Sequence, residues 1–298
     1  MHKELQKFFG RLVNSAQKRG FILDAENEIN YGLRLKFRKK QSSISLNIYY
    51  SKKKGISYYI TSQSDREISR EFKEIIFKLI NKKNHQWKKW AGTDESGKGD
   101  FFGPLVACGF VADGNIAKKL IHFGVADSKK LSDKKIVEIA KKIYANFAAN
   151  IELIILKPSK YNELYQKFRN QNKKLNHMLA WMHSRIILNL NKKHNFKGTV
   201  IDKFAHANVI KYALKDMKNI TFSSQIKAES DIAVAAASII ARYHFLQQLK
   251  ALSKKYDISL TKGASKQTIK KVKEFAKKYS KVILSEVAKV HFKTINKI

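Results

Sequence analysis

Two adjacent carboxylates, Asp94 and Glu95, have the type and setting that most directly suggest chemistry in this chain. They end a short apolar stretch at residues 90–93 that is typical of a strand, and the turn Gly97-Lys98-Gly99 follows them. Hard divalent cations prefer oxygen ligands, and glycines let a phosphate approach the backbone closely. The stretch therefore predicts a place where a divalent cation and a phosphate-bearing ligand can meet.

Two more acids stand where they could join this pair. Asp202 ends an apolar strand pattern at residues 199–202, and Glu229 precedes an alanine-rich helical pattern at residues 230–242. Acids at strand ends can converge in a sheet although they are distant in sequence. A pair of Mg²⁺ ions about 3.5–4 Å apart needs several carboxylates, and without metal such acids repel one another. Asp231 is close by, and the pattern alone does not separate it from Glu229.

The net charge indicates a polyanionic partner. The 298 residues include 60 Lys and Arg but only 24 Asp and Glu, a formal charge of +36. The excess is spread along the chain, since residues 1–85 carry +11 of it. Nucleic acid is the simplest such partner, although a lysine-rich genome would also raise this count. Because 51 of the basic residues are lysines, which contact phosphate as point charges, the composition favours backbone recognition over base reading.

Other classes are disfavoured by what the chain lacks. The single cysteine, Cys108, excludes an internal disulfide and gives too few thiols for a structural zinc site, so we expect it to be a buried small residue. Nothing resembles a secretion signal, and no apolar run approaches the roughly 18–20 residues that a membrane span needs. We therefore expect a cytoplasmic protein with no membrane partner. Nothing suggests an obligate dimer, and we expect a monomer.

Residues 1–83 predict a small α+β domain. A helical stripe at residues 1–20 is followed by three alternating runs at 31–37, 44–50 and 56–60, with a turn at 53–55, and by a closing helix at 72–80. One face of the sheet is expected to lie under the helices. The other can present a basic, tyrosine-bearing surface: Arg34, Lys36 and Arg38 with Asn47, Tyr49 and Tyr59. Such a surface suits nucleic-acid docking, and a merely solvated face is the alternative.

The pattern breaks at residues 81–86, and we place a linker at residues 84–89. From residue 90 to 298 strands alternate with helices, which predicts a second domain built on a mixed α/β sheet. Strands are expected at 90–94, 103–111, 151–156 and 199–202. Helices are expected after Ser132 as N-cap, at 176–190, at 230–242 and in the basic segment 270–298. His183, His206 and His244 could serve as general bases, but each is expected to be a packed or surface histidine.

Four segments occur in the order found in the type 2 ribonucleases H, and the chain closely resembles that family. They are residues 92–100, the Asp-Ser-Lys-Lys-Leu-Ser run at 127–132, the Ile-Asp pair at 201–202, and Lys-Ala-Glu at 227–229 with the alanine-rich stretch to Arg242. The chain looks like the ribonuclease HIII branch. Its loop has Gly-Lys-Gly where ribonuclease HII usually has Gly-Arg-Gly, its fourth acid is Glu229 where ribonuclease HII has Asp, and an N-terminal domain precedes the catalytic one. Residues 161–165 and 172–183 also look like that branch, so the resemblance covers essentially the whole chain.

The resemblance implies a ribonuclease-H-like mixed sheet with flanking helices, preceded by a small domain similar to the TATA-binding-protein fold. It also implies an endonuclease that cleaves the RNA strand of RNA–DNA hybrids and leaves 5′-phosphate and 3′-hydroxyl ends. Asp94, Glu95, Asp202 and Glu229 match the family's catalytic, metal-binding acids. They would hold two Mg²⁺ or Mn²⁺ ions, with Asp94 as the ligand that bridges both.

The same resemblance assigns substrate contacts. Backbone groups of Gly97 and Gly99 would meet the sugars and phosphates, and Lys98 would face phosphate. Ser128, Lys129 and Lys130 would add phosphate contacts. Because Lys98 stands where the related branch has Arg, we expect a preference for runs of ribonucleotides over a single embedded ribonucleotide. Two alternatives remain: ribonuclease HII-like incision at isolated ribonucleotides, and a nucleic-acid-binding protein without catalysis.

Overall fold

The computed structural model describes residues 2–51, 55–80, 85–202, 209, 220–225 and 228–292. The chain divides into two compact units, Met1–Asn84 and His85–Ile298. Residues 81–84, which include the first residue of the expected linker, and residues 53–54 of the expected turn lie outside the described residues. Within the described part of the chain, no helix is both long enough and apolar enough to cross a membrane.

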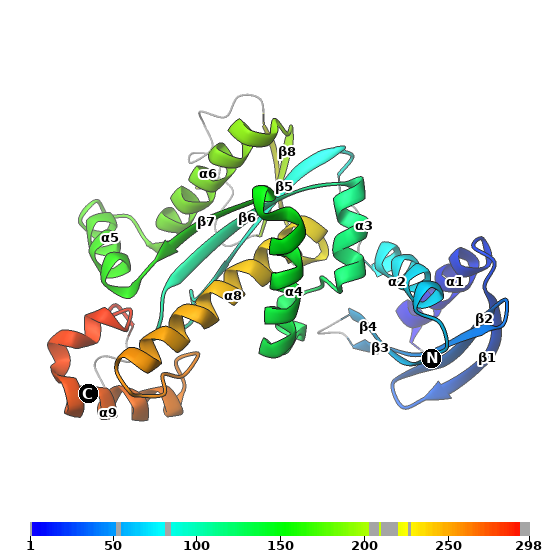
Figure 1. Ribbon diagram of the computed structural model, residues 1–298, viewed down its shortest axis with the longest axis horizontal. Coiled ribbons are helices and arrows are strands. Elements are labelled where there is room, and N and C mark those ends of the chain that lie inside the picture. The colour runs from blue at the N-terminus through cyan, green and yellow to red at the C-terminus, as the bar shows by residue number, and fades with distance from the viewer. Residues whose placement is uncertain are drawn as a thin grey trace. The chain divides into compact units, whose positions relative to one another are not determined.

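The first unit is a four-stranded antiparallel sheet with two helices (Figure 1). Its elements in chain order are α1 (Lys3–Gln17), β1 (Ile22–Ile29), β2 (Gly32–Lys39), β3 (Ser42–Ser51), β4 (Gly55–Gln63) and α2 (Arg66–Ile80). Sequence alternation predicted three of these strands and both helices. It did not predict β1, an edge strand in which every residue is exposed or half-buried, so that no buried face marks it in the sequence.

The alternation of β2 and β3 separates the two faces of this sheet. Leu33, Leu35 and Phe37 are fully buried on the face that packs against Phe8 of α1 and Phe72 of α2. Full burial of such a side chain contributes about 1.5–3 kcal/mol, which explains why the register of β2 is well determined. The intervening residues Arg34, Lys36 and Arg38 are exposed on the opposite face, as the sequence predicted.

The second unit is built on a five-stranded mixed sheet of order β7-β6-β5-β8-β9. Its strands are β5 (Lys89–Ser96), β6 (Leu105–Asp113), β7 (Ile151–Leu156), β8 (Gly198–Asp202) and β9 (Thr221–Gln225). β6 is antiparallel to both β5 and β7, whereas β5, β8 and β9 are parallel. The mixed sheet was predicted from the sequence, although β9 was not and β6 begins later than expected. Cys108 of β6 is free and buried, as predicted.

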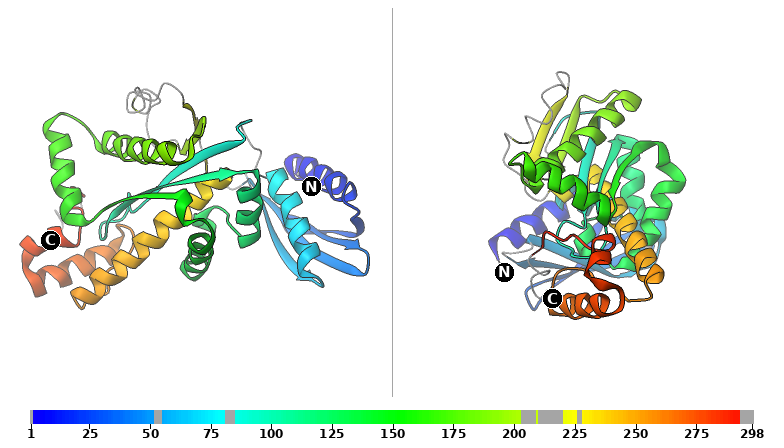
Figure 2. Two further views of the ribbon diagram at one scale, coloured as in Figure 1. Left: turned by 45° about the horizontal axis from the view of Figure 1, so that its top comes forward. Right: turned by 90° about the vertical axis from the view of Figure 1, so that its left-hand side faces the viewer.

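Helices cover both faces of this sheet. They are α3 (Gly114–Phe123), α4 (Asp133–Phe147), α5 (Pro158–Asn170), α6 (Leu175–His194), α8 (Ile232–Lys255) and α9 (Lys266–Ile283). The helices α6 and α8 pack on opposite faces of β5 and β6 (Figure 2). The alanine-rich start of α8 allows close packing: a Cβ on Gly92 of β5 would lie 2.2 Å from Val234 N. Residues 85–89, expected to be part of the linker, contact this unit, since Trp87 covers Gly198 and His85 reaches Asp231.

Candidate active site

The end of β5 places two carboxylates beside a pocket. Asp94 is 7 % exposed, and the side chain of Glu95 is 9 % exposed. Both line a pocket of about 390 Å³, together with the glycine loop, Ser128, Lys129 and Arg242. The backbone N–H of Glu95 donates to Asp94 Oδ1 at 2.8 Å, which orients the Asp94 carboxylate. The lining also includes Asp100 and four basic side chains: Lys98, Lys129, Arg242 and Lys262. Nearly buried acids beside basic side chains suit a divalent cation, and a phosphate bound through that cation.

The backbone brings the third acid to the same level of the sheet. In the parallel pair β5–β8, Thr93 is the partner of Ile201, so the following residues, Asp94 and Asp202, are next to each other on neighbouring strands. Glu229 lies in the short 3-10 turn Ala228–Ser230 that leads into α8, and this turn contacts β8. The side chains of Asp202 and Glu229 lie outside the described part of the structure. The ends of β5 and β8 and the turn before α8 therefore lie close together, while the four-carboxylate cluster stays a prediction.

Asp231, which the sequence did not separate from Glu229, has a structural role. Its Oδ1 accepts hydrogen bonds from the backbone N–H groups of Ala233 at 2.9 Å and Val234 at 3.2 Å, so it is the N-cap of α8. Trp90 Nε1 also donates to this carboxylate at 3.0 Å, and His85 Nε2 lies 3.1 Å from its Oδ2. These contacts bind the carboxylate to the start of α8 and to β5.

His183 of α6 was expected to be a packed histidine, and it is 1 % exposed. It also contacts the site: Nδ1 lies 2.8 Å from Thr93 Oγ1, and Nε2 lies 3.2 Å from Glu95 Oε2. Burial alone would raise the pKa of Glu95, but the hydrogen bond and charge interaction with His183, together with Lys98, lower it. His183 thus favours the ionised form of Glu95. The sequence offered only its place in the family-like segment 172–183 as a signal for this role.

The glycine loop has two glycines with different requirements. Gly97 has a φ of +92°, and a Cβ there would lie 2.1 Å from Pro104 O, so the fold itself requires glycine. A Cβ on Gly99 would meet nothing within 4 Å. Lys98 Nζ lies 3.6 Å from Glu95 Oε1, so the loop lysine adds positive charge directly beside the acids.

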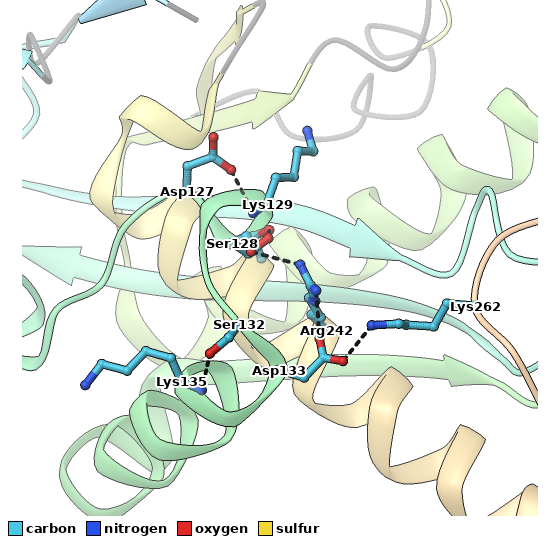
Figure 3. A network of polar contacts seen from close by, with 9 residues as sticks. Asp127, Ser128, Lys129, Ser132, Asp133, Lys135, Arg242 and Lys262 are labelled. Carbon is cyan, nitrogen blue, oxygen red and sulfur yellow. Dashed lines mark hydrogen bonds and ion pairs between the residues drawn. The ribbon is translucent and has the colours of Figure 1, made fainter. Parts of the chain in front are cut away.

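The Asp127–Ser132 run is anchored to α8, as Figure 3 shows. Arg242 donates to Ser128 O at 2.8 Å and to Asp133 Oδ1 at 2.7 Å, and Lys262 Nζ reaches Asp133 Oδ2 at 2.6 Å. Ser128, predicted as a phosphate contact, is buried with its hydroxyl 2.7 Å from Ser238 Oγ. Lys129 is exposed at the pocket, and the side chain of Lys130 lies outside the described residues. The sequence could not predict this network, because each of its contacts with Arg242 or Lys262 joins residues more than 100 positions apart.

Of the two other histidines considered from the sequence, the structure describes only His244. His244 Nε2 lies 2.5 Å from the Tyr144 hydroxyl, and burial lowers the pKa of His244. His206 lies outside the described part of the chain.

Residues 91–295 match the family model described as Ribonuclease HII. The chain belongs to the type 2 ribonuclease H family. Two of its relatives are named ribonuclease HIII. The protein of Chlamydia felis is 36% identical over 97% of this chain and 94% of its own length, and that of Protochlamydia amoebophila is 43% identical over 70% of this chain and 67% of its own. As a member of the ribonuclease HIII branch, the chain is an endoribonuclease.

The fold agrees with this membership in the type 2 ribonuclease H family. The crystal structure of Bst-RNase HIII in complex with Mn²⁺ matches with a TM-score of 0.65 and 24% identity, and the match covers 99% of this chain and 95% of that one. The likeness includes the four-stranded sheet of the first unit as well as the mixed sheet of the second. The fold class predicted from the sequence is therefore confirmed.

Proposed function

We propose that this endoribonuclease hydrolyses the RNA strand of RNA–DNA hybrids and leaves 5′-phosphate and 3′-hydroxyl ends. One observation supports this above all others: in a type 2 ribonuclease H, the nearly buried pair Asp94 and Glu95 lies beside a glycine-lysine-glycine loop in a pocket that lysines and an arginine also line. The pocket offers acids for cations and backbone groups for sugars and phosphates. A cytoplasmic, monomeric enzyme stays our prediction.

The chemistry of the donors fits divalent cations. Asp94, Glu95, Asp202 and Glu229 would supply only carboxylate oxygens, the ligands that Mg²⁺ and Mn²⁺ prefer. A pair of such ions would stabilise the attacking and leaving oxygens of an in-line displacement at phosphorus. The protein contributes the arrangement of the donors: the Glu95 N–H orients Asp94, and His183 with Lys98 keeps Glu95 ionised. The relative crystallised with Mn²⁺ agrees with this class of ion.

The glycine loop would recognise ribose. Because the packing of the protein does not require glycine at position 99, a close ligand explains the missing side chain better than folding does. A 2′-hydroxyl both donates and accepts, so backbone groups can distinguish it without reading a base. Lys98 and Lys129 would contact phosphate. Ser128 and Lys130, which flank Lys129 in the Asp127–Ser132 run, would add further phosphate contacts.

The first unit would add affinity. Arg34, Lys36 and Arg38 of β2 form an exposed basic row, which we name the β2 basic row, and Tyr59 of β4 is 69 % exposed on the same face. Arg34 Nε donates to Asn47 Oδ1 at 3.3 Å, which holds its guanidinium over the sheet. This surface suits a nucleic-acid backbone and carries no chemistry.

An end-labelled hybrid tests the proposal. Wild-type protein with Mg²⁺ or Mn²⁺ should cut the RNA strand, and Asp94→Asn should abolish cleavage while hybrid binding persists, because only a cation ligand is lost. Asp202→Asn should behave in the same way. Binding without cleavage by the wild type would favour the non-catalytic alternative, and turnover by Asp94→Asn would remove that residue from the site.

The choice between the two branches of activity needs a second substrate. A DNA duplex with a block of four ribonucleotides should be cut well, and one with a single ribonucleotide poorly, because Lys98 lacks the forked donors of arginine. Equal rates on both duplexes would favour ribonuclease HII-like incision instead.

A further inference from the structure

The C-terminal part of the chain holds the loop that carries Gly97 and Lys98. Phe101 N donates to Gly263 O at 3.0 Å, Gly103 N to Val287 O at 2.9 Å, and Lys289 N to Phe101 O at 2.9 Å. Phe102 and Ala288 also form a β-bridge. A segment that was expected only to be basic and helical therefore supports the pocket through backbone bonds.

One side chain of this segment is unusual. Lys289 is fully buried, with its Nζ 2.7 Å from Gly103 O, 3.4 Å from Pro104 O and 5.7 Å from the centre of the Tyr161 ring. Lysine is almost never fully buried without strong partners, because desolvation of the ammonium is costly. Burial lowers the pKa of Lys289 to about 7, although the charge of Asp100 opposes this. A methionine would fill the same volume at a lower cost, so packing alone does not explain a lysine here.

The carbonyls that Lys289 contacts belong to the backbone that fixes the glycine loop. Gly97 lies so close to Pro104 O that a Cβ would be 2.1 Å from it. A shift of the 103–104 backbone would therefore move Gly97, and with it Lys98 beside Glu95. Asp100 Oδ1 accepts from Gly263 N at 2.6 Å and holds the middle of the same loop.

We propose that Lys289 is a positioning residue for the 97–104 loop: by donating to Gly103 O and Pro104 O, its buried side chain sets where Gly97 and Lys98 lie over the Asp94–Glu95 pocket. Its consequence for catalysis rests on the proposed function. The reacting phosphate depends on the loop for its alignment, whereas most of the affinity for the hybrid comes from charge spread over the chain. Loss of Lys289 should therefore lower kcat much more than it raises KM.

A second residue acts on the same segment from another side. Asn162 of α5 donates through Nδ2 to Ala288 O at 2.8 Å and to Ser285 O at 3.2 Å, and its Oδ1 accepts from Val290 N at 3.1 Å. Asn162→Ala would loosen the segment around Lys289 without removing a side chain that contacts the loop.

The experiment compares Lys289→Met with Lys278→Met, an exposed α9 lysine that pairs with Asp257. Lys289→Met should lower kcat on a hybrid by about tenfold or more and change KM by less than about threefold, and Lys278→Met should do neither. Amide hydrogen exchange of residues 97–104 should accelerate only in Lys289→Met, with β5 and α8 protected as in the wild type.

Two results would overturn the proposal: wild-type kcat with wild-type loop exchange in folded Lys289→Met, or a loss confined to thermal stability. If Lys289→Met does not fold, Asn162→Ala decides by the same two readouts, with a smaller fall in kcat expected. If the wild type cuts no hybrid, the proposed function fails, and loop exchange still tests the positioning role because it needs no substrate.

Discussion

At the scale of single residues, local pattern predicted the candidate acids but not the side chains that contact them. Asp94 and Glu95 could be predicted because both are adjacent to a strand and a glycine turn. The partner of Glu95 could not be predicted, since His183 is 88 positions away and contacts Glu95 only because α6 packs against β5 and β6. A lone histidine in an apolar helix is usually a packed residue, and His183 is both packed and in contact with a candidate metal ligand.

His183→Ala should therefore weaken the site without abolishing it. Removing a group that orients a metal-ligating carboxylate typically costs about 10–100-fold in metal affinity or activity. Calorimetric titration with Mn²⁺ measures this independently of cleavage, and His183→Asn should recover part of the affinity by keeping one polar partner. His244→Ala serves as the control, because that histidine bonds the Tyr144 hydroxyl. Wild-type Mn²⁺ affinity in His183→Ala would contradict the role.

At the scale of elements, helices and strands with a strict apolar periodicity could be predicted, and those without it were missed. The strands β2 and β3 alternate cleanly, and α6 and α8 are long and apolar, so all four were predicted. The elements missed were β1, α3, α5 and β9. β9 is a short strand, and in α5 only Pro158 and Tyr161 are buried, so neither has a strong apolar pattern. Tertiary contacts stabilise such elements, and a single sequence does not display those contacts.

The β2 basic row allows a test at this scale. Replacing Arg34, Lys36 and Arg38 by Gln should raise the Kd for a hybrid and reduce the slope of log K against log salt by up to about 2.7, roughly 0.9 for each lost phosphate contact. The matched control changes three exposed lysines of the helix that covers the opposite face: Lys3 and Lys7 of α1 and its C-cap residue Lys18. Equal effects of the two triple variants would show that net charge alone, and not this face, determines affinity.

At the scale of the whole molecule, the 97–104 loop depends on residues from both halves of the second unit. Gly97 and Gly103 lie near its start, whereas Gly263, Val287 and Lys289 come from its C-terminal part. Contacts over 160 or more positions leave no local pattern, so nothing beyond a basic helix could be predicted for residues 270–298. In the structure these residues support the 97–104 loop, and one of them is the buried Lys289. The free-energy cost of burying its ammonium depends on pH.

That dependence can be worked out in sign. The pKa of Lys289 is about 7 in the folded protein and about 10.4 in an unfolded chain, so between these values the unfolded chain binds more protons and stability rises with pH. Below pH 7 the full cost of burying the ammonium remains. Lys289→Met removes this cost, so its free energy of unfolding relative to the wild type should be highest below pH 7. The advantage of Lys289→Met should shrink by up to about 1.4 kcal/mol for each pH unit above 7.

Urea unfolding of both proteins at pH 6, 7, 8 and 9 measures the difference in their free energies of unfolding. Taking the difference also cancels the titration of groups that both proteins share. The neighbouring His291, whose pKa is lowered to about 4 by burial and by the charges of Lys289 and Arg169, stays neutral over this range. A stability difference that does not change with pH would mean that Lys289 keeps an ordinary pKa, and that its ammonium is far better solvated than its burial indicates.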